Sequence, residues 1–353
     1  MIFTKSGLAA VRRGLTKMKG EFTRVGDGAA ELGSLLGARE ERHLRGVRVE
    51  WLDCVADRRT IEEALRKIPE SSDWPGLFEV LLEPRGTEKR VAIVLDREGL
   101  MGVVLLRSTG YSSWEPATQW IVPGFLSPVR SGCAQTVLEA LHMRLDVGWW
   151  RQPEPPPSGP RIRIYQQKER HQIDCTKDFD AYWKQVGHLN TVRQARRRCK
   201  DFLLKVDPEG GAEWTIRNCE QKWRSDPRTP EPRLEDRVAA AKFLEQLGRH
   251  HTLVLFDGDL KIAGATCLIH KGSVVYHNPY RAPEYDHHGV GTHILESLFR
   301  WSARSGYRDI DMGTGFKYKE RWAPASGEYT YWLTVSPPKK YAALRRLVRR
   351  LIR

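Results

Sequence analysis

Residues 274–322 read VVYHNPYRAPEYDHHGVGTHILESLFRWSARSGYRDIDMGTGFKYKERW, and this stretch decides the fold of the second half of the chain. It opens within a strand expected over Ser273–Asn278 and continues through a polar loop, Arg281–His288. Gly289–Arg304 then places apolar residues at helical spacing, and Asp309–Met312 has the length of a short strand. We therefore expect a strand, a loop, a helix and a second strand in that order.

The start of this helix has a composition suited to anions. Gly289, Val290, Gly291 and Thr292 form its first turn. The first turn of a helix carries backbone N–H groups without helical acceptors and lies at the positive end of the helix dipole. Glycine there lets a phosphate group approach the backbone closely. The sequence favours a phosphate-bearing ligand at this turn, although glycine is also an ordinary residue at the start of a helix.

Further strands and helices are predicted on both sides of this segment. Before residue 151, the patterns predict strands over 47–51, 77–82, 90–95, 100–107 and 120–122 and helices over 60–68 and 133–145. After residue 160, they predict helices over 178–204, 234–247 and 341–353, with strands over 161–165, 252–256, 262–270 and 328–335. Thr176 is the expected cap of the first of these helices, and Asp257-Gly-Asp259 has the composition of a hairpin turn. Both halves are therefore expected to be α+β.

A proline-rich stretch separates the two halves. Residues 151–160 read RQPEPPPSGP, with prolines at most positions after 152. Such a run forces an extended, solvated path. We interpret it as an interdomain linker, and a proline-rich loop inside one unit is the alternative.

The bulk composition excludes several classes of protein. The 353 residues are enough for two domains, and a mean hydropathy of −0.53 gives no run of about 20 apolar residues that could span a membrane. The N-terminus lacks the apolar core of a secretory signal. The six cysteines show no CxxC spacing, so a zinc site has no support and a reducing, cytoplasmic location is expected. The net charge of +14 predicts attraction to polyanions.

The pattern after Thr176 resembles the acyltransferase family named after the cellulose-biosynthesis protein CelD, within the GNAT superfamily, which is related to the FemAB-type aminoacyltransferases. The resemblance covers about 150 residues as an ensemble of features. They are the helix start Phe179-Asp-Ala-Tyr182, the basic segment Arg193–Lys200, the hairpin at Asp257-Gly-Asp259, Tyr276 with Tyr285, the helix 289–304, and Asp309-Ile-Asp311 followed by Lys317–Trp322.

The resemblance implies an α+β fold of tandem GNAT-like domains, each with a mixed, mostly antiparallel sheet flanked by helices, the N-terminal one degenerate. The expected organisation is a basic N-terminal extension over 1–44, the degenerate domain over 45–150, the linker over 151–160, the catalytic domain over 161–335 and a basic amphipathic helix over 336–353.

The resemblance also implies transfer of an acyl group from acyl-CoA, a co-substrate and not a tightly bound cofactor, to an amine or hydroxyl of a small-molecule, glycan or peptide acceptor. Surface polysaccharide or specialised metabolism would be its setting. Gly289, Val290, Gly291 and Thr292 would meet the donor phosphates. The expected substrate-binding residues are Tyr276, Asn278, Tyr280, Lys317 and Arg321, and no metal is expected.

Direct acyl transfer needs a base for the attacking group and an acid for the leaving thiolate. The candidates for these roles are Asp311, Tyr285, His288 and Tyr318, with His277 and His287 as further ones. Structural alternatives remain: Asp311 would pair with Lys317, Lys319 or Arg321, and His287 and His288 would be solvated. Tyr276 and Tyr280 would pack as aromatic residues of a strand.

One residue departs from the family pattern. A GNAT loop has Arg or Gln three residues before the first glycine, where this chain has Asp286. An acid repels a pyrophosphate, so Arg281 or His288 would have to compensate.

Two basic segments keep other functions open. Arg193–Lys200 could contact tRNA, which would make the protein a FemAB-like aminoacyl-tRNA-dependent ligase, or it could be a solvated helix surface. The C-terminal helix could dock on its own domain or lie peripherally on an anionic membrane. A third interpretation is a basic nucleic-acid or membrane-surface binding protein without catalysis.

Overall fold

The computed structural model of the chain describes residues 46–68, 76–83, 85, 88–110, 113–117, 121, 128–130, 132–142, 146–147, 150–152, 162–223, 234–314 and 317–335. The expected N-terminal extension, most of the proline-rich stretch and the C-terminal helix lie outside these residues. Val49–Arg353 forms one compact unit that contains both sheets. The domain boundaries expected from the sequence stay predictions.

The first half of this unit holds a five-stranded sheet with the order β1-β2-β3-β4-β5. Its strands are β1 (Arg48–Leu52), β2 (Lys89–Asp96), β3 (Gly99–Gly110), β4 (Ser113–Pro116) and β5 (Asp146–Val147), and its helices are α2 (Arg58–Arg66), α3 (Leu77–Leu82) and α4 (Ala134–His142). The hairpin expected between β2 and β3 is confirmed, with Asp96 paired to Gly99.

The strand expected over 77–82 is wrong, because these residues form helix α3. Gly76 enters the helix with φ +80°, a left-handed conformation that glycine adopts without strain. Leu77 and Leu81 then share one buried face at i and i+4 spacing. A short, uniformly apolar run has no periodicity with which to separate a strand from a helix.

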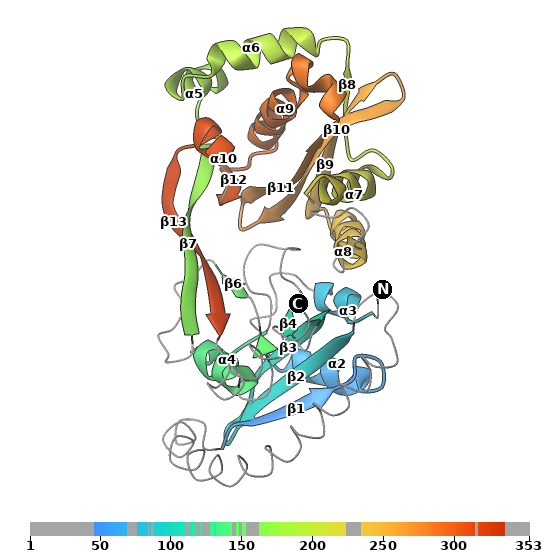
Figure 1. The fold of residues 1–353 in the computed structure, drawn as a ribbon, viewed down its shortest axis with the longest axis vertical. Helices are drawn as coiled ribbons and strands as arrows, with labels where there is room; N and C mark the ends of the chain where they lie inside the picture. The colour runs from blue at the N-terminus through green and yellow to red at the C-terminus, as the bar shows by residue number, and fades with distance from the viewer. Residues whose placement is uncertain are drawn as a thin grey trace, which may run out of the picture. The chain divides into compact units, whose positions relative to one another are not determined.

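The second half holds an eight-stranded sheet with the order β6-β13-β7-β12-β11-β10-β9-β8. Its strands are β6 (Trp150–Gln152), β7 (Ile162–Asp174), β8 (Leu203–Val206), β9 (His250–Asp257), β10 (Leu260–His270), β11 (Ser273–Arg281), β12 (Asp309–Thr314) and β13 (Ala325–Val335). The β11–β12 pair is parallel and the other pairs are antiparallel. In Figure 1 the green β7, the longest strand of the sheet, lies beside the red β13.

The helices of this half are α5 (Phe179–Gln185), α6 (Leu189–Arg198), α7 (Gly211–Trp223), α8 (Leu234–Gln246), the short 3-10 helix η2 (Pro283–His288), α9 (Val290–Arg304) and α10 (Lys317–Trp322). The single helix expected over 178–204 is wrong. Gly187, at φ +75°, separates α5 from α6, and the chain then enters strand β8. The helix cap is Asp178 and not Thr176, since its carboxylate accepts the Ala181 N–H at 2.9 Å.

Both faces of the second sheet are covered. Leu253 and Leu255 of β9 pack in a core with Leu298 of α9. Val254 points the opposite way, toward α7, where it lies near Gly211. Strand β11 is therefore sandwiched, with α9 on one face of the sheet and α7 on the other.

The α+β fold class expected from the sequence, with mixed and mostly antiparallel sheets flanked by helices, is confirmed. None of the described helices is long and apolar enough to cross a membrane. All six cysteines are free thiols.

Candidate active site

The two central parallel strands separate along their length. The pairing of β11 with β12 joins Ser273 to Asp309 and ends where Val275 meets Asp311. Beyond that point β11 stays paired with β10 as far as Arg281, and β12 stays paired with β7. The backbone groups facing the gap are thus released from the ladder, and the gap opens beside the start of α9.

A cavity of about 610 Å³ occupies this region. Its lining residues come from β10, β11, η2, α7, α9, α10 and the turn before α9, and they are Lys222, Gly264, Tyr276, Pro279, Tyr280, Arg281, Asp286, Gly289, Gly291, Thr292, Ile294, Leu295, Tyr318, Arg321 and Trp322. Lys222 belongs to α7 and Ile294 to α9, on opposite faces of the sheet. The cavity is therefore walled by residues from both faces of the sheet.

The glycine-rich turn expected to bind phosphates lies at this cavity. Gly289 has φ +75° and links η2 to α9, while Gly291 and Thr292 form the wall beyond it. Val290 differs, since its side chain is completely buried in the core and offers only its backbone. No side chain of the residue before the helix caps the first turn. Its N–H groups and the helix dipole therefore favour an anion at this wall.

Asp286 does not stand alone at this wall. Its carboxylate forms an ion pair with the Arg281 guanidinium, through Nε and through Nη2 at 3.3 Å. Arg281 also lies next to Gly291, because a Cβ built on that glycine would be 3.3 Å from the Arg281 Cδ. The sequence indicates that Asp286 would repel a pyrophosphate. In the structure its charge is neutralised by Arg281, one of the two residues expected to compensate for it.

Tyrosine 318 on α10 is the catalytic candidate that lines the cavity. The surrounding protein partly desolvates its phenol, which raises its pKa to about 12, although the residue as a whole stays 36% exposed. Burial likewise raises the pKa of Tyr276 well above its ordinary value. Both hydroxyls are thus protonated at neutral pH and can donate hydrogen bonds or a proton.

The other three catalytic candidates are not among the lining residues. Asp311 is almost fully buried between Ile310 and Met312, whose side chains pack in the core with α9, so it points to the opposite face of the sheet. There it forms an ion pair with Arg170 and accepts the Gly313 N–H at 2.7 Å.

Tyr285 and His288 lie on η2, on the outer side of the turn. The Tyr285 hydroxyl donates to the Asp257 carboxylate at 2.9 Å, which raises the pKa of the phenol. The His288 ring stacks against Phe202 and His287, with centroids 5.2 and 4.0 Å away. These contacts give both residues a structural role in holding the turn.

Some of the expected substrate-binding residues line the cavity and others do not. Tyr276, Tyr280 and Arg321 line the cavity, while Asn278 and Lys317 are not among the lining residues. Asn278 is buried and lines a small internal cavity on the other side of the strand.

The lining residues that the sequence did not single out as site residues include Lys222, Gly264 and Pro279. Pro279 could have been found, because a proline inside a strand pattern marks a break in the ladder. Lys222 could not have been found from the sequence, because helix α7 was not predicted. Among the described residues, no group of three or more His, Cys, Asp or Glu side chains is placed to hold a metal ion.

The basic segment on α6 is largely engaged within the protein. Arg193 pairs with Asp180 at 2.8 Å, and Arg196 pairs with the buried Glu296. Arg198 donates to the His287 carbonyl at 3.0 Å. These bonds fix α6 against α9 and η2. They therefore give this segment a structural role.

One family model matches the part of the chain that carries this cavity. Residues 187–332 match the family model described as Acetyltransferase (GNAT) domain. The matched range contains β11, α9, β12 and α10, together with every residue that lines the cavity. No curated protein matches the chain.

Solved structures of similar arrangement are distant in sequence. A tandem GNAT protein from the clavulanic acid biosynthesis pathway is 12% identical, with a TM-score of 0.46, over 83% of this chain and 99% of that one. The C-terminal domain of a lysylphosphatidylglycerol synthetase described as putative, from Agrobacterium fabrum, is 12% identical, with a TM-score of 0.47, over 81% and 95%. FemX is 10% identical, with a TM-score of 0.45, over 83% and 99%.

Proposed function

We propose that the protein transfers an acyl group from acyl-CoA to an amine or hydroxyl acceptor, as a CelD-like member of the GNAT superfamily acting in the cytoplasm. The observation that carries this proposal is the cavity at the start of α9, where β11 and β12 separate. Its volume of about 610 Å³ lies in the usual range of ligand sites.

The lining suits a donor with an anionic end and an apolar arm. The first turn of α9 offers backbone N–H groups to the pyrophosphate, and the guanidinium of Arg281, whose charge balances that of Asp286, lies beside it. Toward the interior the wall becomes apolar, with Ile294, Leu295 and Trp322. The pantetheine arm and the acyl group would lie along this apolar part.

The proposed chemistry uses residues that line the cavity. The acceptor nitrogen or oxygen attacks the thioester carbonyl carbon, the C–S bond breaks, and the acceptor proton passes to water. The Tyr318 hydroxyl, protonated at neutral pH, donates its proton to the departing thiolate and regains one from water. Lys222 and Arg321 give the cavity further positive charge, which favours an acceptor that carries an anionic group.

Two measurements test the proposal. Acetyl-CoA and longer acyl-CoAs should raise the melting temperature, because a ligand that binds only the folded state stabilises it. Release of free thiol from acyl-CoA should then depend on an acceptor in a panel of amines, hydroxyls and amino-acid derivatives. Absence of stabilisation by every acyl-CoA would overturn the proposal.

The aminoacyl-tRNA-dependent alternative predicts a different result. Binding would require tRNA, would weaken steeply with salt and would depend on Arg197, an exposed cation of α6, and on Lys200, which is exposed just after that helix. A turnover assay with a charged tRNA as the donor separates the two alternatives, since an acyl-CoA enzyme would show no turnover with that donor.

A further inference from the structure

Strand β11 contains a bulge at the wall of the cavity. Gly264 of β10 pairs with Tyr280, and Thr266 pairs with His277, so Asn278 and Pro279 together face the single residue between them on β10. One extra residue in a strand bends it and re-aims the neighbouring side chains. The bulge thus sets the direction of Pro279 and Tyr280, which both line the cavity.

The backbone at this bulge is not the one that the sequence would prefer. Asn278 has φ +43°, in the left-handed region, and a proline follows it. Asparagine tolerates this region better than most residues, yet the residue before a proline favours an extended backbone. Surrounding contacts must therefore hold the bulge in place.

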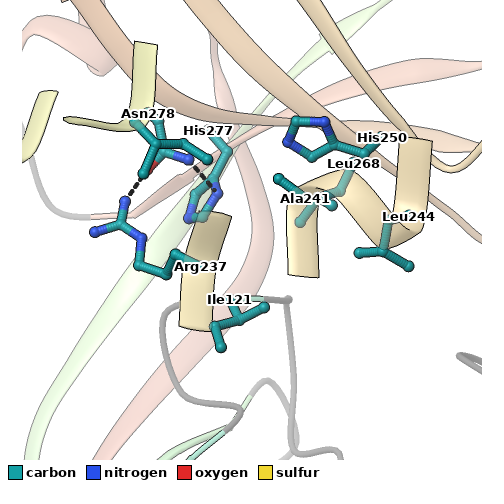
Figure 2. A pocket seen from close by; sticks show the side chains of 9 residues that line it. Ile121, Arg237, Ala241, Leu244, His250, Leu268, His277 and Asn278 are labelled. Atoms are coloured by element: carbon teal, nitrogen blue, oxygen red, sulfur yellow. Dashed lines mark hydrogen bonds between the residues drawn. The ribbon is translucent and has the colours of Figure 1, made fainter. Parts of the chain in front are cut away.

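Those contacts come from the amide of Asn278, which is held at both ends. Its Oδ1 accepts a hydrogen bond from Arg237, and its Nδ2 donates to the Thr266 hydroxyl at 2.9 Å. Figure 2 shows the Arg237 guanidinium pointing at this amide, with His277 on the neighbouring position of the strand. The amide is 6% exposed, so water does not replace either partner.

Arg237 is itself fixed by a second helix. It lies on α8, is 7% exposed, and forms an ion pair with Glu220 of α7. Burial lowers the pKa of its guanidinium to about 10, so it remains a cation at neutral pH. Trp214 of α7 also meets the Tyr280 ring edge to face, with centroids 5.2 Å apart. The helices on one face of the sheet thus hold the strand that forms the cavity wall.

We propose that Arg237 and Asn278 are positioning residues: the ion pair between α7 and α8 fixes the Asn278 amide, which fixes the β11 bulge in the shape that the acyl end of the donor requires. This inference rests on the proposed function for its ligand. Reactive groups must be held within about 1 Å of their productive positions, so a relaxed bulge impairs binding of the acyl end without touching the phosphate end.

The test uses three variants. Asn278→Gly keeps the left-handed backbone accessible and removes the amide. Asn278→Asp keeps an acceptor for Arg237. The double variant Glu220→Gln, Arg237→Met removes both charges, since removing one would leave the other buried and unpaired. The matched control is Lys242→Met, which removes a different ion pair between the same helices, that of Lys242 with Glu213 at 2.7 Å.

Crystal structures and isothermal titrations give independent readouts. We expect the glycine and double variants to displace Tyr280 by about 1 Å and to weaken acetyl-CoA binding at least about tenfold, with adenosine 3′,5′-bisphosphate binding unchanged. The aspartate variant should restore affinity to within about threefold, and the control should change nothing.

An unmoved Tyr280 in both variants would overturn the inference, whatever the affinities. An equal loss of affinity in the Lys242→Met control would also overturn it, because loosening of α7 against α8 would then explain the effect. If the unmodified protein binds no acyl-CoA, the proposed function fails, and the crystal structures alone decide whether Arg237 positions the bulge.

Discussion

Replacing Gly291 by alanine should stabilise the protein and weaken binding of coenzyme A at the same time. Gly291 lies inside helix α9, where alanine is about 0.5–1 kcal/mol more favourable than glycine. The new methyl group would meet the Arg281 Cδ at 3.3 Å, and that side chain, 47% exposed, can move by a few tenths of an ångström. The melting temperature should therefore rise by roughly 1–4 °C.

The binding side of the prediction follows from where the methyl group stands. It would occupy the cavity wall, between the first-turn N–H groups and an approaching phosphate. A hydrogen bond to a charged group contributes about 1.5–3 kcal/mol, so its loss should weaken coenzyme A binding about 10- to 100-fold. Scanning fluorimetry measures the first effect and isothermal titration calorimetry the second.

Gly306→Ala is the matched control. Gly306 has φ +79° and nothing within 4 Å of the added Cβ, so alanine there is strained but lies away from the cavity. It should lower the melting temperature, by a strain of about 1–2 kcal/mol, and leave affinity unchanged. If Gly291→Ala bound coenzyme A as tightly as the unmodified protein, the start of α9 would not be the donor site.

Three further predictions concern single side chains. Tyr318→Phe should lower kcat about 10²-fold or more with an unchanged Kd for coenzyme A, measured by thiol release. Burial alone would raise the pKa of Glu296, but hydrogen bonds from His293 and Arg300 and the charge of Arg196 lower it to about 2. The stability that the ionised Glu296 contributes should therefore be full above about pH 4.5 and lost as the pH falls toward 2. Acid unfolding of the unmodified protein compared with the Glu296→Gln variant would show this loss. Asp311→Asn should lower the melting temperature, since it breaks a buried ion pair, without raising the Kd for coenzyme A.

The elements that the sequence predicts well are those with local signals. The hairpin at Asp257-Gly-Asp259 is confirmed, with Gly258 at φ +56° in the turn. The helix at 289–304 is confirmed because its apolar residues repeat at helical spacing over four turns. The glycines at its start were found for the same reason, since they stand at a helix boundary visible in the pattern.

The elements that the sequence misses depend on contacts far along the chain. Helix α7 buries Ala212, Thr215, Ile216 and Cys219, and only Ala212 and Ile216 join an apolar cluster with α8. A stripe of such small and polar residues is a weak signal for a helix. The break at Gly187 divides a helical pattern that reads as continuous, because its residues before and after the glycine are equally good helix formers. Lys222 could be assigned to the cavity only after α7 is placed.

The prediction of site residues also depends on details that a local pattern does not fix. Asp311 follows the strand order expected for an active-site acid, but one position along a strand decides which face a side chain occupies. Ile310 and Met312 face the core with α9, so Asp311 faces Arg170. Sequence alone could locate the strand to within a residue or two. That precision does not determine on which face of the sheet the Asp311 side chain lies.

The charge at the start of α9 shows why a site cannot be judged one residue at a time. Asp286 alone would repel a pyrophosphate, yet its pairing with Arg281 cancels the acid and brings a guanidinium against Gly291. The two residues are five apart along the chain, and only the turn made by η2 brings them together. An anion that approaches the first turn therefore meets a neutral pair and the positive end of the helix dipole, which is attraction where the sequence alone suggested repulsion.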